Sequence, residues 1–192
     1  MKGSRNKSPH STRRKPGRPR GKSPVLHLLP KPERTESSSA ERRDIAYALR
    51  YWEGLRGGRA LPAFHDIEPD KLARLWPFAF LADVGQGGGG PEQAVVLYSG
   101  SSLGNFLRNS TAGVSCAQCL PRVVWERMKH AFSAAVEEKT PLGVSDHYTL
   151  QDGRTAVYRS IIMPLSDEDG NVAKILGVVK FKLQSSKEPK ES

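Results

Sequence analysis

The stretch that decides the fold is residues 142–183, LGVSDHYTLQDGRTAVYRSIIMPLSDEDGNVAKILGVVKFKL. It divides into three runs rich in β-branched and aromatic residues, separated by two polar turns, QDG and SDEDGN. Asp-Gly between such runs favours a tight hairpin turn, because glycine readily adopts the positive φ that these turns require. The stretch therefore predicts three consecutive antiparallel strands.

The last of these runs predicts a sheet with two unlike faces. Along residues 172–183, large apolar side chains recur at odd positions and lysines recur at even positions. Successive side chains of a strand point to opposite faces, so one face is apolar and the other is basic and hydrated. An antiparallel sheet of this kind is covered on one face only. The rest of the chain must supply that cover.

The preceding elements complete the predicted architecture. Apolar residues at helical spacing before Gly57-Gly58 predict an N-terminal helix. Residues 78–84 and 94–99 read as two strands, and residues 121–139 as a long amphipathic helix. The predicted fold is therefore of the α+β class, with a five-stranded antiparallel sheet covered on one face by helices and preceded by the N-terminal helix.

Charge and composition divide the 192 residues unevenly. Residues 1–24 hold nine Lys or Arg and no acid, which leaves 21 bases and 20 acids for the rest of the chain. Residues 1–38 are also rich in proline and poor in apolar residues, so we expect a disordered basic arm there. The predicted domain spans residues 39–184, and a disordered tail follows at 185–192. Neither a signal peptide nor a membrane-spanning run is present, so we expect a cytoplasmic protein without membrane contact.

The order of elements resembles the PAS fold, and several motifs resemble one bacterial PAS family. The resemblance covers about residues 44–183 and implies a sensory or regulatory module that senses a small ligand or docks a signalling partner. It specifies no cofactor and implies no enzymatic activity. The motifs that carry it are YWEGLRGGRALP at 51–62, DIEP at 66–69, FLADV at 80–84, YSGS at 98–101, NSTAG at 109–113 and IIMPLS at 161–166.

Within the arm, residues 13–22, RRKPGRPRGK, resemble an AT-hook. Such a Gly-Arg-Pro core lies in the narrow, strongly negative minor groove of A·T-rich DNA. The alternative is a generic basic arm that binds polyanions or keeps the protein soluble. A second hypothesis for the function is therefore a DNA-associated regulator whose PAS domain is a dimerisation platform. The candidate nucleic-acid residues are Arg13, Arg14, Lys15, Gly17, Arg18, Pro19, Arg20 and Lys22.

Residues with chemical potential are sparse in the predicted domain. No Ser-His-Asp arrangement or pair of carboxylates occurs at a recognisable spacing, so we expect no catalytic site. Cys116 and Cys119 have the CxxC spacing of a redox dithiol, but no second pair completes a zinc site. We interpret them as buried small residues of a helix and expect no metal site.

Two residues are candidates for a ligand pocket, Arg159 and Tyr148. Arg159 alternates with Ile161 and Met163, which places a charge on an apolar stripe. A buried arginine needs an anionic partner, and a ligand would supply one. In the alternative interpretation, the stripe is the outer face of the sheet, or Arg159 reaches the rim with its charged end.

The N-terminal helix supplies a candidate dimer interface. Its apolar stripe is formed by Ile45, Leu49, Trp52 and Leu55. The sheet is not expected to cover this stripe fully, and uncovered apolar patches usually mark an interface. We therefore expect a homodimer, with a signalling protein or A·T-rich DNA as further partners.

Overall fold

The structure is a computed structural model that describes residues 39–85, 90–107 and 111–184. The helices are α1 (Ser39–Arg56), α2 (Ser101–Leu107), α3 (Cys116–Cys119) and α4 (Arg122–Glu138). The strands are β1 (Ala79–Asp83), β2 (Val95–Ser99), β3 (Leu142–Thr149), β4 (Thr155–Ser166) and β5 (Val172–Gln184). Short 3₁₀ helices occupy Phe64–Asp66, Pro69–Leu72, Trp76–Phe78 and Gly90–Gln93.

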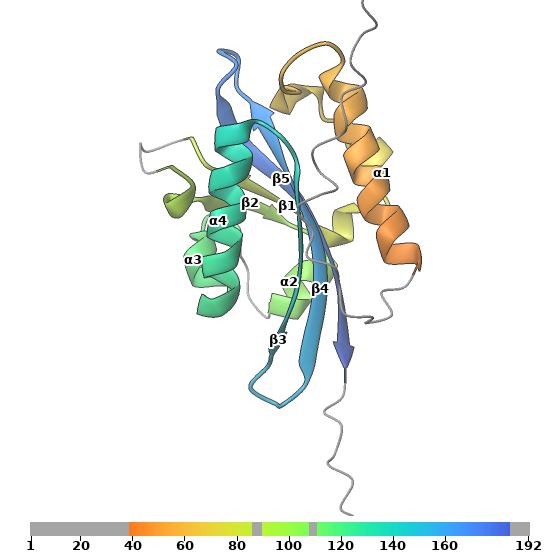
Figure 1. Cartoon of the computed structure of the whole chain (residues 1–192), viewed down its shortest axis with the longest axis vertical. Coiled ribbons are helices and arrows are strands. Elements are labelled where there is room, and N and C mark those ends of the chain that lie inside the picture. Colours follow the sequence, from red (N-terminus) through yellow and green to blue (C-terminus); the bar gives the residue numbers. More distant parts are fainter. Residues whose placement is uncertain (1–38, 86–89, 108–110, 185–192) are drawn as a thin grey trace, which may run out of the picture.

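The strands form one antiparallel sheet in the order β2-β1-β5-β4-β3. This confirms the predicted five-stranded sheet. The glycines expected in the two hairpin turns, Gly153 and Gly170, have φ values of 81° and 80°. β5 lies at the centre, between β1 and β4. The last strand therefore joins the first two strands to β3 and β4 in a single sheet. Figure 1 shows the sheet between α4 on one side and α1 on the other.

The inner face of the sheet, defined here as the face toward α2, α3 and α4, carries one hydrophobic core. Phe132 of α4 stacks on Phe80 of β1 with ring centroids 5.9 Å apart, and Trp125 meets Phe132 edge-on at 6.0 Å. Gly177 of β5 lies under Phe80, where a Cβ would overlap the ring. The glycine therefore lets a large aromatic ring lie close to the sheet.

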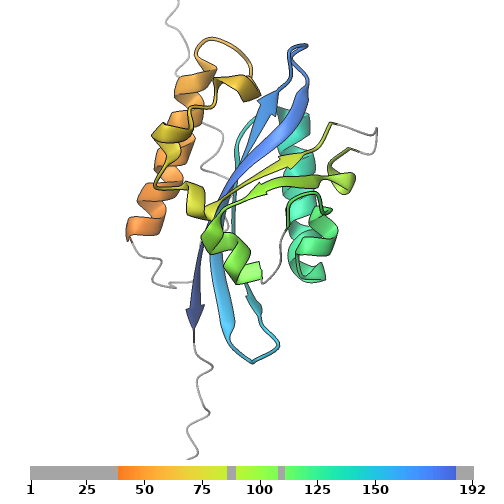
Figure 2. The same ribbon diagram turned by 180° about the vertical axis from the view of Figure 1, so that it is seen from behind.

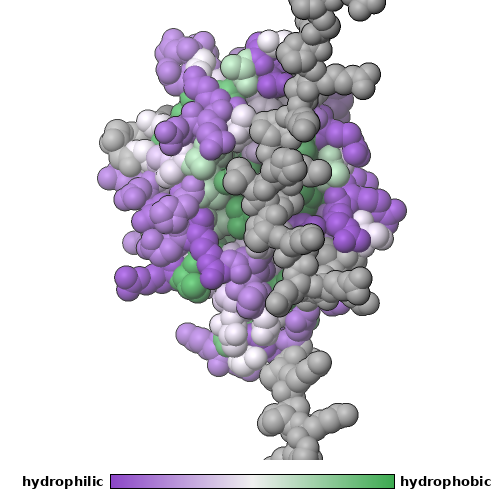
Figure 3. All heavy atoms as spheres, in the orientation of Figure 1, coloured by the Kyte–Doolittle hydropathy of each residue, from purple (hydrophilic) through white to green (hydrophobic). Residues whose placement is uncertain are grey.

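α4 is amphipathic, as its sequence predicts. Its buried residues face the inner core, and hydrophilic side chains predominate at the left of Figure 3, where α4 lies. None of the helices within the described ranges combines the length and apolar character needed to cross a bilayer.

The outer face of the sheet, toward α1, is also covered, which differs from the expected one-sided arrangement. Ala48 and Trp52 of α1 pack with buried residues of β4 and β5 in a second core. On β5, Leu176 and Val178 are 1% and 0% exposed, although they share a face with the lysines.

The lysines of this outer face are accommodated by partners that the sequence pattern did not reveal. Lys180 Nζ lies 2.9 Å from Asp44 Oδ2 of α1 and 3.3 Å from the centroid of the Phe78 ring. A long amphipathic side chain can cover apolar surface with its stem while its charge finds a partner. α1 therefore packs against the face of the sheet that carries the lysines, which the sequence predicted to be hydrated.

Candidate functional site

A cavity of about 70 Å³ lies in the inner core, between the sheet and α2, α3 and α4. Apolar and aromatic side chains form most of its wall, among them Phe80, Leu103, Val124 and Met128. Pockets for drug-sized ligands measure roughly 300–1,000 Å³. At its present volume the cavity therefore admits only a molecule of a few heavy atoms.

Four lining residues carry buried hydroxyls with no hydrogen-bond partner among the described residues. They are Ser99 of β2, Thr111 before α3, and Tyr158 and Ser160 of β4. Buried polar groups are nearly always hydrogen-bonded, and leaving one unsatisfied costs about 1–3 kcal/mol. Four unsatisfied hydroxyls around one cavity provide a set of groups with which a bound molecule would hydrogen-bond.

A β-bulge brings Ser99 into this set. Phe80 pairs with Ser99 and Ala82 with Val96, so the register shifts and Leu97 is left without a partner on β1. Val96 and Ser99 are three residues apart, yet both line the cavity. An extra residue in one strand allows this, because it reverses the alternation of side chains beyond it.

The described wall of the cavity carries no charged side chain. None of the lining residues that the structure describes is Asp, Glu, Lys, Arg or His. Burial raises the pKa of Tyr158, with Arg127 opposing this effect in part, and burial also raises the pKa of Tyr148. Both phenols are therefore protonated at neutral pH and available as donors.

Both cysteines line the cavity, and both are free and buried. Burial, reinforced by the neighbouring Cys119, raises the pKa of Cys116 to about 12, and burial raises the pKa of Cys119 as well. The thiolate is the form that attacks disulfides and ligates metals, so these protonated thiols act as small apolar wall residues. The described part of the chain holds no group of three or more His, Cys, Asp or Glu that would bind a metal ion.

The structure does not bring the two predicted pocket residues together. Tyr148 lines the cavity, and its ring meets Phe106 edge-on at 6.3 Å. Arg159 is not among the lining residues, because it lies between Tyr158 and Ser160, which do line it. On a strand, this position places Arg159 on the outer face, beside Lys180 of β5.

Sequence reasoning missed the hydroxyls because β4 is buried on both faces. Tyr158, Ser160 and Ile162 face the inner core, whereas Ile161 and Met163 belong to the outer core. Both stripes of a doubly covered strand are apolar, so alternation does not identify the ligand side. The available signal was that one stripe combined Tyr and Ser hydroxyls while the other carried Arg159.

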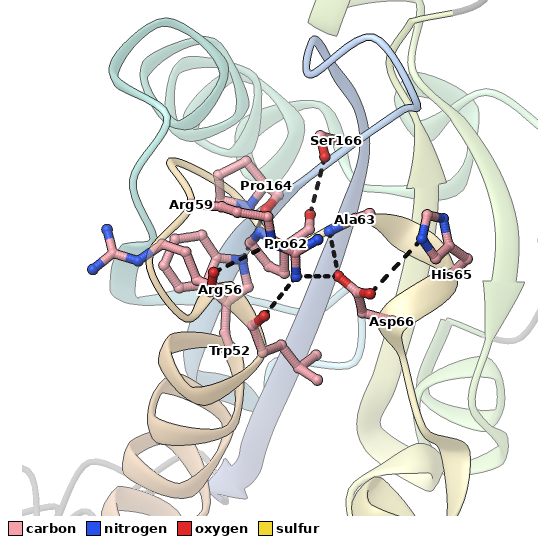
Figure 4. A network of polar contacts seen from close by, with 10 residues as sticks. Trp52, Arg56, Arg59, Pro62, Ala63, His65, Asp66, Pro164 and Ser166 are labelled. Atoms are coloured by element: carbon pink, nitrogen blue, oxygen red, sulfur yellow. Dashed lines mark hydrogen bonds and ion pairs between the residues drawn. The ribbon is translucent and has the colours of Figure 1, made fainter.

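The motif at residues 51–62 contributes to a polar network that attaches α1 to the sheet (Figure 4). Trp52 Nε1 donates a 2.7 Å hydrogen bond to the Pro164 carbonyl oxygen of β4. Asp66 Oδ2 accepts hydrogen bonds from the Arg59 guanidinium at 2.5 Å and from the Ala63 N–H at 2.8 Å. Burial alone would raise the pKa of Asp66, but these two donors outweigh burial and hold it below the usual value. Trp52 and Arg59 of this motif therefore make structural contacts.

The predicted dimer stripe lies against its own chain. Trp52 is 2% exposed, and Ile45 and Leu49 pack against the same outer core. Leu55 is half-buried. An interface through Trp52 would require α1 to leave the sheet.

The predicted nucleic-acid residues, Arg13 to Lys22, lie outside the described residues, as does the predicted tail at 185–192. The limits of the predicted domain, 39 and 184, therefore stay a prediction.

No curated protein matches the chain. The chain is similar to the light-state structure of the blue-light photoreceptor Aureochrome1 LOV, with 19% identity, a TM-score of 0.40, and 57% of this chain and 84% of that chain covered. It is similar to the PAS domain of Bordetella pertussis BvgS, with 17% identity, a TM-score of 0.43, and coverage of 57% and 85%. It is also similar to the PAS domain of a Colwellia psychrerythraea protein, with 14% identity, a TM-score of 0.43, and coverage of 58% and 93%.

A family model described as a PAS domain matches residues 40–180, which is most of the chain and nearly all of its described residues. These residues include α1 except for its first residue, strands β1 to β4, β5 as far as Lys180, and every residue that lines the cavity. By this match, the chain belongs to the PAS domain family.

Proposed function

We propose that this PAS domain is a non-catalytic sensory module whose cavity binds a small, neutral, mainly apolar molecule with one or more hydrogen-bonding groups. The observation that carries the proposal is a set of four hydroxyls around one cavity that have no hydrogen-bond partner among the described residues. A few well-placed polar groups in an apolar wall are what fixes the orientation of a small ligand. Among the described lining residues none is charged, which disfavours anionic and cationic ligands because these residues offer no counter-ion.

β4 supports a signalling role because it contacts both the cavity and α1. Tyr158 and Ser160 line the cavity from its inner face. Ile161 and Met163 pack toward α1 from its outer face, and the Pro164 carbonyl oxygen accepts the Trp52 hydrogen bond. A ligand that draws Ser160 into a hydrogen bond would therefore act on the strand that holds α1.

The proposal is tested by comparing two buried serines of β4. In the ligand-free protein, Ser160→Ala is expected to be neutral or to stabilise by about 1 kcal/mol, because it removes an unsatisfied hydroxyl. Ser166→Ala is the matched control and is expected to destabilise by about 0.5–1.5 kcal/mol, because Ser166 Oγ donates a hydrogen bond to the Pro62 carbonyl oxygen at 3.4 Å. Urea denaturation of both variants measures these changes.

Ligand binding supplies the second measurement. Native mass spectrometry of freshly purified protein reports a retained ligand. Thermal shifts with n-butanol and with butyrate, which differ mainly in charge, test the neutrality of the site. We expect a shift with butanol that is reduced in Ser160→Ala and no shift with butyrate. An equal shift with butyrate, or a wild-type response in Ser160→Ala, would contradict the proposal.

A second candidate function is DNA binding through the basic arm, and the charge asymmetry favours it. Residues 1–24 hold nine of the 30 bases without an acid, whereas the remainder is nearly neutral. Lysines and arginines that meet phosphates release counter-ions, so the sequence-independent part of DNA affinity would come from the arm. A PAS domain with such an arm would be a DNA-associated regulator.

We expect any DNA binding to depend on the arm and on salt. If about five to seven charges meet phosphates, log K should fall against log salt with a slope of roughly −4 to −6 on duplex DNA. For an AT-hook, Arg18→Ala should remove a preference for A·T-rich duplex more than Lys2→Ala does, because only Arg18 would reach the groove floor. Salt dependence without A·T preference would leave a generic basic arm.

A homodimer and a signalling protein partner stay predictions. Light scattering of the full chain at high micromolar concentration tests the first. Because Trp52 is buried, a dimer that used the predicted stripe would require α1 to leave the sheet.

A further inference from the structure

A second hollow, of about 520 Å³, lies on the outer face of the sheet. Its floor is a row of side chains in register across three strands: Tyr98 of β2 pairs with Leu81 of β1, and Leu81 pairs with Leu176 of β5. Phe64, Ile67, Pro69 and Trp76, from the segment between α1 and β1, form its wall. We call this hollow the outer groove; Figure 2 shows that segment between α1 and the sheet.

The walls of the outer groove are held in place. Trp76 Nε1 donates a 2.8 Å hydrogen bond to the Pro69 carbonyl oxygen, and Tyr98 meets the Trp76 ring edge-on at 5.4 Å. Despite this order, Phe64 and Tyr98 remain 40% and 39% exposed. A fixed, concave and aromatic surface of this size is suited to binding apolar side chains.

The sequence supplies an occupant for this groove. Residues 25–29, VLHLL, form an apolar run within residues 1–38, between Pro24 and Pro30. The residue before a proline is restricted to extended conformations, so Leu29 favours an extended run. An extended peptide presents alternate side chains to the same surface, here Leu26 and Leu28.

We propose that residues 25–29 dock in the outer groove of their own chain, with leucine side chains against Tyr98, Trp76 and Phe64. The reach of the chain permits it. Nine residues, 30–38, join the run to the start of α1 and span at most about 30 Å. Arg74 contacts Asp44 at 3.5 Å, and Asp44 lies five residues, or about 7.5 Å of helix, from Ser39. The Trp76 end of the groove is therefore close to where the run is tethered.

The tether makes a weak contact effective. A segment joined to its site by a short linker meets that site at an effective concentration on the order of millimolar. A run that binds with only millimolar affinity is then bound about half of the time. Docking would hold the adjacent basic residues, 13–22, against the domain, which would make their access to a partner dependent on the groove.

The test is a cross-linking experiment in which histidines are replaced by cysteine, so that the apolar side chains of the run and of the groove are unchanged. His27→Cys is combined with His65→Cys, because His65 lines the groove and its side chain is 72% exposed. The matched control combines His27→Cys with His130→Cys, an exposed position on α4, across the sheet. The native Cys116 and Cys119 are 3% and 8% exposed, so we expect them to react slowly with a short bismaleimide. Dilute full-length protein is treated, and cross-links are assigned by peptide mass spectrometry.

We expect the cysteines at positions 27 and 65 to cross-link within one chain about tenfold faster than those at positions 27 and 130. The reason is that docking in the outer groove would hold residue 27 near residue 65, whereas an undocked segment would not be held there. Adding Leu26→Ser and Leu28→Ser should lower this rate to that of the control. Equal rates for the two pairs would overturn the proposal. So would an unchanged rate with the serine substitutions, or cross-links that join only different chains, which would indicate that a second copy fills the groove.

Discussion

Replacing Trp52 with alanine is expected to detach α1 from the sheet. The indole is 2% exposed in the outer core, and its N–H donates a 2.7 Å hydrogen bond to the Pro164 carbonyl oxygen of β4. Truncation of a buried tryptophan costs about 3–5 kcal/mol, and an unsatisfied buried carbonyl adds to this loss. We expect a loss of about 4–6 kcal/mol, a large part of the roughly 5–15 kcal/mol by which domains are stable.

Urea denaturation followed by circular dichroism measures this loss, and Trp52→Phe separates its two causes. Phenylalanine keeps most of the ring but removes the donor, so we expect a loss of about 1–3 kcal/mol. The same experiment tests the dimer interface predicted from the sequence. If Trp52 served mainly in a dimer contact, Trp52→Ala would give a stable monomer, with a loss below about 1 kcal/mol.

Replacing Gly100 with alanine is the second large expected effect, because backbone atoms surround this residue. A Cβ there would overlap the Trp76 carbonyl oxygen and lie 2.6 Å from the carbonyl carbon and oxygen of Pro77. Gly100 is also held in place, since its N–H donates to the Ala79 carbonyl oxygen at 2.8 Å. Overpacking of this kind costs about 1–3 kcal/mol where side chains can yield. Here the backbone would have to move, so we expect a loss of at least about 3 kcal/mol.

Gly104→Ala is the matched control for this substitution. Gly104 lies in α2, where the nearest atom to an added Cβ is Ser99 Oγ at 3.9 Å, which is ordinary contact. Alanine favours helix over glycine by about 0.5–1 kcal/mol, so this variant should gain stability. The two alanines, four residues apart, are therefore expected to change the urea midpoint in opposite directions. A gain in Gly100→Ala would show that the junction of β2 and α2 can shift.

The sequence indicated the sheet because its strands and turns are local features. Gly153 and Gly170 adopt the positive φ that their turns require. Each glycine lies between two runs that are rich in β-branched residues. The length and apolar face of α4 are likewise local, since a helix of 17 residues shows its periodicity within its own sequence. The resemblance to the PAS fold predicted a PAS domain over about residues 44–183, and the family model matches residues 40–180.

The candidate site depended on contacts that local pattern does not specify. Ser99 reaches the cavity through a bulge, and a register shift leaves no periodic signal in a five-residue strand. Tyr158 and Ser160 face the cavity and Arg159 does not, because only one face of β4 is turned toward α4. Both faces of β4 carry apolar residues, so the sequence does not show which face this is. The sequence suggested that Tyr148 and Arg159 line one pocket, and the structure places them on opposite faces of the sheet.

By itself, the sequence determined the class of fold, the positions of the strands along the chain, and the separation of charge between the arm and the domain. Each of these features depends only on residues that are close together in the sequence. Only the tertiary structure decided that α1 covers the basic face of the sheet. Lys180 reads as a solvated charge until Asp44, 136 residues earlier in the chain, is placed 2.9 Å from it. Burial is a property of both partners in a contact, so a pattern along one strand determines its faces but not what lies against them.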